Sequence, residues 1–408
     1  MNMLYEEINP DGVTEADIAV FLPSFQEAAN IAFPTRKAAI GLVNCYPQYT
    51  KVIVNCDNNS QDGTREAFFG AECETPRIYV STPPGVRGRG ANALNIFKKA
   101  ADLSAKAIVI IDANLTSIKT SWMRGLLEPI LSGCSEMVTP LYVRHPYDTP
   151  VTRFFAYPMM RSLFGRRVMQ PICADRAFSA RLNKVFLDYG QWELDDRGYS
   201  LDLTMLGLAI INQAPICQSF MAHPRVTVDS RPLETAMTNS FKNVAAAMFN
   251  LMLKTDKEWS KVTRSRPTAL AGVDQPPQNL PPQVTVDCKF LASEFRRLGT
   301  AGQPLWAEFF NPDLAGRLTA ALNSVEPDSR PLLIEDWREA IFSAAIAYKN
   351  QPGRRDDIVM ALEPLLYAKC LTARNMAKNL NEQQYNTLLE SEAMAFDNGK
   401  KNFVARWG

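Results

Sequence analysis

The sequence predicts an α/β protein with a doubly wound, mostly parallel sheet and a helical C-terminal region. Short apolar runs rich in Val and Ile occur at 18–24, 51–57, 77–82 and 107–113. Each run is followed by turn-forming residues and then by a helix-like stretch; these stretches lie at about 28–44, 64–70, 92–102 and 121–131. Strands that are apolar along their whole length and alternate with helices are typical of parallel sheets covered on both faces.

Beyond residue 136 the alternation is less regular. Strand-like runs occur at 136–143 and 215–223, with an aromatic, Met-rich helix at 151–165 between them. A Pro-rich stretch at 265–285 leaves little room for regular structure and indicates a linker or extended arm. Amphipathic helices fill 287–404. We therefore expect three parts: a first domain at 1–230, a helix plus Pro-rich linker or arm at 231–286, and a helical region at 287–408.

Composition excludes several classes of protein. The chain has 408 residues, with 44 Lys and Arg against 43 Asp and Glu, and a formal charge of +1. This balance argues against a nucleic-acid binder held by phosphate neutralisation. Eight scattered cysteines form no C-x-x-C pair, which favours reduced thiols in a cytoplasmic protein. The start has no signal-peptide pattern, and no apolar run approaches the roughly 18 residues of a transmembrane segment.

The loops that follow the four N-terminal strands are expected to share one crevice. They are 23–27, 57–64, 85–90 and 112–115. The carboxyl ends of parallel strands meet at the same edge of a sheet, and open α/β sheets bind their ligands there. This edge is therefore where we expect the functional residues.

The first two loops offer polar groups for a ribose or a base. Pro23, Ser24 and Glu27 follow the first strand, and Asp57 and Ser60 follow the second. Glu27 is equally well explained as a first-turn helix carboxylate favoured by the helix dipole. Asp, Asn and Ser in such loops also often serve only to close turns.

The third loop, at 85–92, places Arg87 and Arg89 among three glycines. Glycines allow the backbone to approach an anion, and guanidinium groups donate hydrogen bonds to phosphate oxygens. The spacing is neither that of a P-loop nor that of a dinucleotide fingerprint. A basic surface turn is the alternative interpretation.

The fourth loop presents Asp112 and Asn114 directly after a buried strand. Oxygen ligands two residues apart on an extended segment lie on the same side, and hard divalent cations prefer oxygen. Together the four loops fit a nucleotide-sugar site, with ribose and base on the first two, a diphosphate on the third and a metal at the fourth.

On these motifs the chain resembles the GT-A glycosyltransferases. GRGANAL is similar to their GKG-x-x-x-L element, and VIIDANL to the strand that carries their D-x-D motif. More specifically, it resembles the retaining mannosylglycerate synthases and glucosyl-3-phosphoglycerate synthases over about residues 17–230. The segments behind this likeness are YVRHP at 142–146, VTRFFAYPMMRSLF at 151–164, QPICAD at 170–175 for Q-P-L-G-G-E, and GYSLD at 198–202 for G-(Y/I)-x-(E/D).

The resemblance implies an enzyme that moves a hexose, mannose or glucose, from a nucleotide-diphosphate sugar to a small hydroxy-acid or polyol such as glycerate. Its divalent metal, Mg²⁺ or Mn²⁺, would be held by Asp112, Asn114 and His223, which stands where the family has its third ligand. Arg89, the metal and Arg225 would neutralise the diphosphate. Because Asn114 replaces an acidic ligand, we expect weaker or partial metal dependence.

The resemblance also suggests residues for the reacting sugar and the acceptor. Asp202 would hold the acceptor or the donor sugar, the backbone at Ile172 would lie near the anomeric carbon, and Asp175 stands where the family has the Glu of Q-P-L-G-G-E. Two substitutions in that motif, Cys173 and Ala174 in place of paired glycines, crowd a loop that normally lies against the sugar.

On the acceptor side, the resemblance points to Arg144, His145 and Thr152. Pro150 stands near the position of an arginine that holds a phosphorylated acceptor in one subfamily, which argues against such an acceptor here. His145 is equally explained as a residue that caps a strand end.

Three alternatives stay open. An inverting transferase would use Asp202 or Asp196 as a general base on a lipid or polysaccharide acceptor. A degenerate member would bind a nucleotide sugar without turnover. The helix at 151–164 either lies on a membrane surface or packs in a core or homodimer interface.

Overall fold

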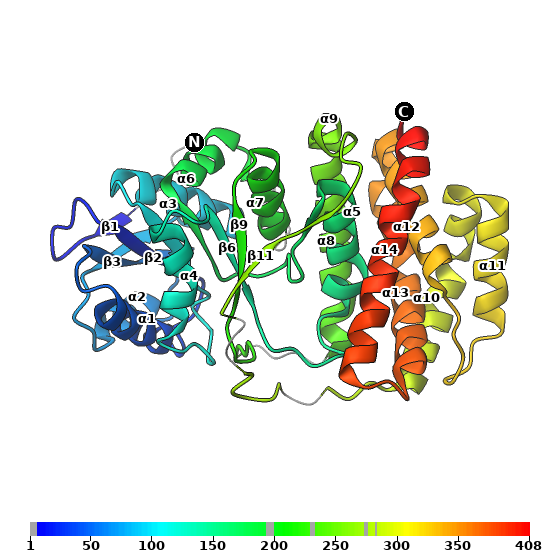
Figure 1. The fold of residues 1–408 in the computed structure, drawn as a ribbon, viewed down its shortest axis with the longest axis horizontal. Helices are drawn as coiled ribbons and strands as arrows, with labels where there is room; N and C mark the ends of the chain where they lie inside the picture. The colour runs from blue at the N-terminus through cyan, green and yellow to red at the C-terminus, as the bar shows by residue number, and fades with distance from the viewer. Residues whose placement is uncertain (1–5, 193–199, 229–232, 273–275, 282–283) are drawn as a thin grey trace. The chain divides into compact units, whose positions relative to one another are not determined.

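The computed structural model describes two compact units in one chain (Figure 1). It describes residues 6–192, 200–228, 233–272, 276–281 and 284–408. The first unit comprises 1–144, 170–231 and 268–282, and the second comprises 145–169, 232–267 and 283–408. In sequence order the chain therefore leaves the first unit and returns to it twice.

The first unit is built on one sheet that has nine strands within the described residues, in the order β1-β4-β3-β2-β5-β8-β6-β9-β11. Their bounds are β1 Glu6–Ile8, β2 Ile18–Ser24, β3 Lys51–Asp57, β4 Arg77–Ser81, β5 Ala107–Ile110, β6 Met137–Leu141, β8 Arg176–Ser179, β9 Ile216–Phe220 and β11 Ala269–Ala271. Strands β2 to β5 pair in parallel, as do β6, β9 and β11. The antiparallel strands are β1 and β8.

The order of the parallel strands confirms the predicted doubly wound architecture. Starting from β2, the chain adds β3 and β4 on one side and then β5 on the other. The direction of winding reverses between β2 and β5, and this is the point where open α/β sheets form their binding crevice. The loops after β2 and β5 therefore border the crevice.

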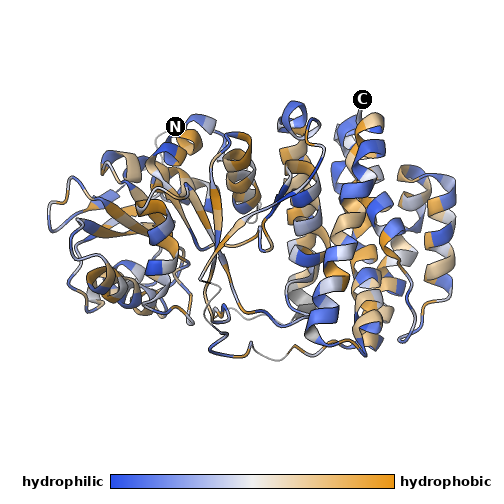
Figure 2. Cartoon of the chain, viewed as in Figure 1, coloured by the Kyte–Doolittle hydropathy of each residue, from blue (hydrophilic) through white to orange (hydrophobic). Residues whose placement is uncertain are grey.

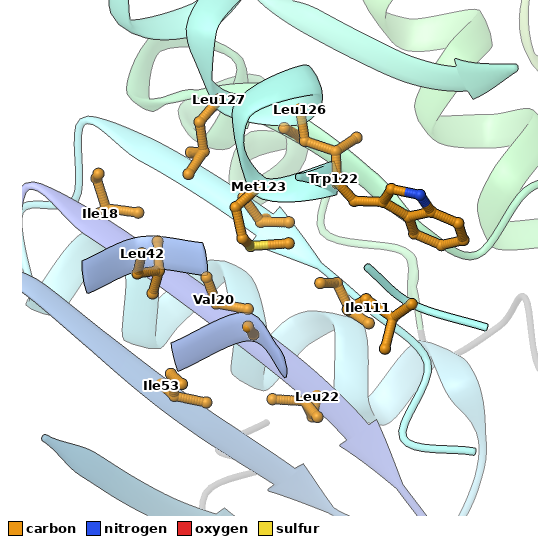
Figure 3. Close-up of a cluster of buried hydrophobic side chains, with 14 of the residues drawn as sticks. Ile18, Val20, Leu22, Leu42, Ile53, Ile111, Trp122, Met123, Leu126 and Leu127 are labelled. Carbon is orange, nitrogen blue, oxygen red and sulfur yellow. The ribbon is translucent and has the colours of Figure 1, made fainter. Parts of the chain in front are cut away.

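Helices cover both faces of this sheet. Ile18, Val20 and Leu22 belong to one apolar cluster with α1 (Ala32–Cys45) and α4 (Trp122–Leu131), and Figure 3 shows these side chains packed together. Successive residues of a strand point to opposite faces, so Ala19 and Phe21 face the other layer. That layer contains α3 (Arg89–Asp102) and α6 (Ala180–Tyr189), whose Phe97 and Phe186 form an aromatic cluster with Phe178 of β8. The remaining helices of the unit are α2 (Thr64–Gly70) and α7 (Ser200–Ile211).

The second unit is helical. Its elements are a π-helical turn at Thr152–Ala156, α5 Tyr157–Phe164, β7 Arg166–Arg167, α8 Leu233–Lys254, α9 Asp256–Trp259, β10 Arg266–Pro267, α10 Cys288–Phe309, α11 Pro312–Asn323, α12 Ile334–Asn350, a 3₁₀ turn at Pro352–Arg354, α13 Arg355–Ala377 and α14 Glu382–Trp407. Hydrophilic and apolar residues alternate along these helices, whereas apolar residues concentrate in the strands of the sheet (Figure 2). Among the described helices, none combines the length and apolarity that crossing a membrane requires.

Helix α5 belongs to the core of the second unit. Arg161, only 1% exposed, pairs with Glu390 at 2.6 Å and with Asp397 at 2.9 Å, both on α14. The hydroxyl of Tyr157 also donates to Glu390 at 2.6 Å. The sequence left open whether 151–164 lies on a membrane surface or packs in a core or homodimer interface. These contacts are those of core packing.

The Pro-rich stretch contains more regular structure than its composition predicts. The residues of β10 pair with β7, and β11 joins the edge of the large sheet beside β9. Both segments are two or three residues long, and short strands at an edge tolerate proline. The backbone N–H of Gln278 then donates to the carbonyl of Ala222 at 2.8 Å, which fixes this segment to the first unit.

Candidate functional site

The loops after β2 and β3 are joined by a buried carboxylate. Asp57, fully buried, accepts hydrogen bonds from the hydroxyls of Ser24 at 2.7 Å and Tyr79 at 3.0 Å. Ser60 donates two more, from its backbone N–H at 2.6 Å and its hydroxyl at 2.8 Å. The side chain of Asp57 thus holds the two loops together, as the turn-closing interpretation of this loop predicts. The hydroxyls of Ser24 and Ser60 both donate to this carboxylate.

Glu27 lies where the chain enters α1. Its backbone N–H donates to the hydroxyl of Thr64 at 2.9 Å, and its carboxylate accepts from Asn30 at 2.7 Å. Thr64 is in turn held by Asp62, whose second oxygen accepts from the N–H of Ala28. Glu27 therefore sits at the rim of the crevice on a rigid loop, with its side chain partly exposed.

The Arg and Gly loop has the backbone that its glycines predict. Gly85 and Gly88 adopt φ values of 81° and 123°, which residues other than glycine rarely adopt. Arg87 is exposed and stacks over the ring of Phe25, with 4.6 Å between the guanidinium carbon and the ring centroid. Arg89 begins α3 and reaches Asp112, with 3.5 Å between its terminal nitrogen and Oδ1. Of the two arginines, Arg89 is the one directed to the end of β5.

Two distant segments are fastened together beside Asp112. The backbone N–H of Thr116 donates to the carbonyl of Val226 at 2.9 Å, and the N–H of Val228 donates to the carbonyl of Asn114 at 3.2 Å. The hydroxyl of Ser117 accepts from the N–H of Val226 at 2.9 Å. These bonds bring the segment with Asp112 and Asn114 alongside the segment with His223 and Arg225, as the resemblance predicts.

A cluster of two carboxylates and two guanidiniums forms the centre of the site. Arg225 donates from Nε to Asp175 at 2.7 Å and pairs through a terminal nitrogen with Oδ2 of Asp112. Asp175 also accepts from the backbone N–H of Asp112 at 3.0 Å and from the hydroxyl of Tyr142 at 2.7 Å. We call Arg89, Asp112, Asp175 and Arg225 the ion-pair cluster.

The environment fixes the charges in the ion-pair cluster. Burial acts to raise the pKa of Asp175, but the charge of Arg225 and the hydrogen bonds from Asp112 and Tyr142 outweigh it, so the pKa is lowered. Burial and the charge of Asp175 raise the pKa of the Tyr142 hydroxyl well above its usual value, which keeps it a donor. Asp175, 1% exposed and bonded at both oxygens, holds Asp112 and Arg225 in position.

The donor types at His223 and Asn114 fit a divalent metal. Burial, followed by the charge of Lys119, lowers the pKa of His223, so its imidazole is neutral near pH 7, the form that binds metals. Its Nδ1 lies 2.8 Å from the side-chain amide of Asn279, and the side chain of Gln278 also hydrogen-bonds the ring, so two neighbours of the Pro-rich stretch orient it. The side-chain oxygen of Asn114 is buried and has no hydrogen-bond partner within the described residues.

The same site is poor in acidic ligands. Within the described ranges, no group of three or more His, Cys, Asp or Glu side chains is placed to hold a metal ion. Only Asp112 brings negative charge to the predicted trio, and its oxygens already face Arg89 and Arg225. A metal here would depend on the amide oxygen of Asn114.

A small cavity lies beside the ion-pair cluster. Its lining includes Pro23, Arg89, Ala174 and Asp202. Asp202 is 2% exposed and forms an ion pair with the buried Arg176, which also donates to the carbonyl of Cys173. Of the predicted sugar residues, Asp202 lines this cavity, together with Ala174 of the crowded loop. Ile172, in the loop before β8, is partly buried, and Asp196, the other predicted base, lies outside the described residues.

The predicted acceptor residues are divided between the two units. Arg144 ends a segment of the first unit and stacks over the ring of Tyr142, at 5.5 Å. His145 and Thr152 belong to the second unit, where Thr152 is buried in the π-helical turn. Burial lowers the pKa of His145, and its Nδ1 accepts from the backbone N–H of Tyr147 at 3.3 Å. Each unit therefore presents part of the predicted acceptor set.

Several residues of the site were not predicted from the sequence. They are Asn55, Tyr142, Arg176 and Asn279. Asn55 offered a usable signal, because it is a polar residue inside the apolar run of β3; its amide donates to the hydroxyl of Ser24 at 2.7 Å. Tyr142 is the first residue of the YVRHP segment, where no role was predicted for it, and Arg176 stands one residue beyond QPICAD. Asn279 lies in the Pro-rich stretch, where no local pattern marks it.

Comparison with known proteins yields structural matches alone. No family model matches the chain, and no curated protein does. Among solved structures, glucosyl-3-phosphoglycerate synthase from Mycobacterium tuberculosis in complex with Mn²⁺, UDP-glucose and phosphoglyceric acid is 22% identical, with a TM-score of 0.43; the match covers 58% of this chain and 79% of that one. The same enzyme with Mn²⁺, UDP-glucose and glycerol 3-phosphate is 21% identical, with a TM-score of 0.41 and coverages of 58% and 80%. A mycobacterial protein matches at 21% identity and a TM-score of 0.44, with coverages of 58% and 74%.

Proposed function

We propose that this protein is a retaining glycosyltransferase that moves a hexose from a nucleotide-diphosphate sugar to a small hydroxylated acceptor such as glycerate. The observation that carries the proposal is the ion-pair cluster at the switch point of the sheet. Arg89 and Arg225 come from segments more than 130 positions apart and meet at the carboxylate of Asp112. Two guanidiniums at the carboxyl ends of parallel strands suit a diphosphate.

The reaction breaks the bond between the anomeric carbon and the diphosphate oxygen and forms one between that carbon and an acceptor hydroxyl oxygen. The sugar becomes oxocarbenium-like while negative charge grows on the departing diphosphate. Arg89 and Arg225 would donate hydrogen bonds to that diphosphate, where charge increases in the transition state. With retention, the acceptor proton ends on the departing phosphate oxygen, so no protein base is needed.

Asp112, Asn114 and His223 are the residues that would hold a divalent cation, Mg²⁺ or Mn²⁺, whose chemistry is to neutralise the leaving diphosphate. Asp175 and Tyr142 would keep Asp112 and Arg225 in place. Pro23 and Glu27 line the route to the nucleotide at the rim of the first two loops. Arg87, exposed beside Phe25, would meet the nucleotide from the outer side.

The small cavity is our proposed place for the reacting sugar. Asp202, held by Arg176, lies in its wall together with Ala174, and the backbone at Ile172 belongs to the same loop. Ala174 brings a methyl group where a glycine would leave space, which favours one hexose over another. For the acceptor we propose Arg144 in this unit; His145 and Thr152 belong to the other unit and stay predictions from the resemblance.

A thermal-shift screen tests the donor. UDP-, GDP- and ADP-sugars are added with and without Mn²⁺ or Mg²⁺, because a ligand that binds the folded state raises the apparent melting temperature. We expect stabilisation by one nucleotide class, lost in Arg89→Met. Arg181→Met, which removes an exposed arginine paired with Glu136 in the same unit, should keep it. If none of these nucleotide sugars raises the apparent melting temperature, the proposed function is refuted.

The stereochemistry of the product separates the rival reactions. Proton NMR of the anomeric coupling in the product of an α-linked donor should show an α-linked sugar. A β-linked product would replace retention by inversion, with Asp202 or Asp196 as the base. Donor binding without transfer to any acceptor would identify a nucleotide-sugar binder.

A further inference from the structure

Arg225 forms an ion pair with Asp112, the carboxylate that the proposed metal would need. Its guanidinium spans Asp112 and Asp175, so it binds two carboxylates at once. The side chain of Arg225 is 15% exposed, that of Asp112 is 22% exposed, and that of Asp175 is 1% exposed. This shielding from water makes the ion pairs less sensitive to screening than pairs at the surface.

A cation that binds Asp112 must share it with this guanidinium. The opposite oxygen of Asp112 faces Arg89 at 3.5 Å, so both oxygens are next to positive charge. Like charges a few ångströms apart repel each other, and more strongly where water is excluded. Asn114 contributes no charge to offset that repulsion.

From these contacts we infer that Arg225 is a built-in counter-cation that competes with a divalent metal for Asp112. Arg225 releases Asp112 when a diphosphate offers it another anionic partner. The inference rests on the proposed function in one respect, that Asp112 is a metal ligand. It adds that metal and nucleoside diphosphate bind cooperatively, and that Arg225 sets the size of the coupling.

Two consequences follow by thermodynamic linkage. The protein without nucleotide binds Mn²⁺ weakly, and a nucleoside diphosphate raises the affinity; the same factor applies in reverse. Removal of Arg225 frees Asp112 in advance, so Mn²⁺ binds more tightly without nucleotide. Coupling of the usual size corresponds to a change of about 5- to 150-fold in the dissociation constant.

The test is a Mn²⁺ titration of the full chain, without nucleotide, followed by electron paramagnetic resonance of the free ion. Arg225→Met should lower the dissociation constant for Mn²⁺ at least fivefold. Arg181→Met loses the same charge at an exposed position of the same unit, 51% exposed, and should leave the constant unchanged. Adding Asp112→Asn to Arg225→Met should abolish the gain.

A second variant guards against misfolding, since Arg225→Met leaves Asp175 buried without its cation. The double variant Arg225→Gln with Asp175→Asn removes both charges and keeps hydrogen-bonding groups at both positions. It should bind Mn²⁺ at least fivefold more tightly than the unmodified protein, with an unchanged circular dichroism spectrum. Unchanged or weaker Mn²⁺ binding in both variants would overturn the competition.

The proposed function fails separately. If no nucleotide sugar stabilises the protein but Arg225→Met tightens Mn²⁺ binding and Asp112→Asn reverses it, the competition stands while the transferase assignment is lost. If nucleotide sugars bind and neither variant changes the Mn²⁺ affinity, the transferase assignment stands and the competition is wrong.

Discussion

The hydroxyl of Tyr142 is a single group whose removal should weaken the centre of the site. It donates to Asp175 at 2.7 Å, and both side chains are at least 97% buried. Tyr142→Phe keeps the ring, which packs 5.1 Å from that of Trp122. The variant therefore removes one hydrogen bond and leaves the packing intact. At Oδ2 of Asp175, the hydrogen bond from Nε of Arg225 remains.

The size of the effect follows from the charge of the acceptor. A hydrogen bond to a charged group contributes about 1.5–3 kcal/mol, or roughly 10- to 150-fold in an opening equilibrium. Tyr79→Phe is a matched control, because its hydroxyl donates to the buried Asp57 at 3.0 Å. In Tyr79→Phe, Asp57 keeps three other donors, one from Ser24 and two from Ser60. The loss of stability in Tyr79→Phe should therefore be smaller than in Tyr142→Phe.

Hydrogen–deuterium exchange with mass spectrometry measures the effect in each unit separately. Protection of backbone amides reports local opening free energies. In Tyr142→Phe, peptides that cover β5 and β6 should exchange about 10- to 150-fold faster, while peptides of α14 in the second unit keep their rates. Exchange of β5 and β6 within twofold of the unmodified protein would refute the reasoning. Equal losses in the two variants would show that the number of remaining donors does not decide the cost.

Two further predictions concern pH. Hydrogen bonds from Lys106 and Thr50 lower the pKa of Asp17 to about 2, so its stabilisation is complete above its unfolded value near 4 and is lost as the pH falls through 2. After solvent screening, ionised Asp17 contributes about 1 kcal/mol to the free energy of unfolding. Urea unfolding of Asp17→Asn at pH 7 should show a loss of this size. Equal urea midpoints for the variant and the unmodified protein would contradict the prediction. Burial lowers the pKa of Lys400 to about 7, so the unfolded chain binds more protons between pH 7 and 10 and the second unit gains stability over that range. Lys400→Met should flatten the rise in urea midpoint, and an unaltered slope would exclude Lys400 as its source.

The strands of the sheet were predictable because their signals are local. Strands β2 and β3 have the predicted bounds, 18–24 and 51–57, since each is a mainly apolar run closed by turn-forming residues. Strand β8 is different. It is four residues long and begins with Arg176, which is buried because Asp202 pairs with it. No local pattern marks a charged residue as a strand residue when its partner lies 26 positions away.

The candidate site was predictable in position but not in its bonding. The sequence locates Asp57 and Asp112 near strand ends, where ligands bind in sheets of this kind, and the resemblance adds Asp175. Whether a carboxylate oxygen is free for a ligand depends on donors from other segments. Asp57 is saturated by two loops and β4, and Asp175 by Tyr142, Arg225 and the backbone of Asp112.

Arg225 shows why the remaining step needs the fold. The sequence analysis predicts that Arg225 binds the diphosphate and that Asp112 binds the metal, as two independent parts of one site. The pairing of 114–116 with 226–228 brings them into contact, so each is the other's partner before any ligand arrives. With Arg89 and Asp175 the ion-pair cluster is electrically balanced, and on our proposal a diphosphate would enter it by exchanging partners. The affinity for donor or metal is then the difference between two sets of ion pairs, which is why single-charge substitutions here should alter coupling between ligands as well as binding of each one.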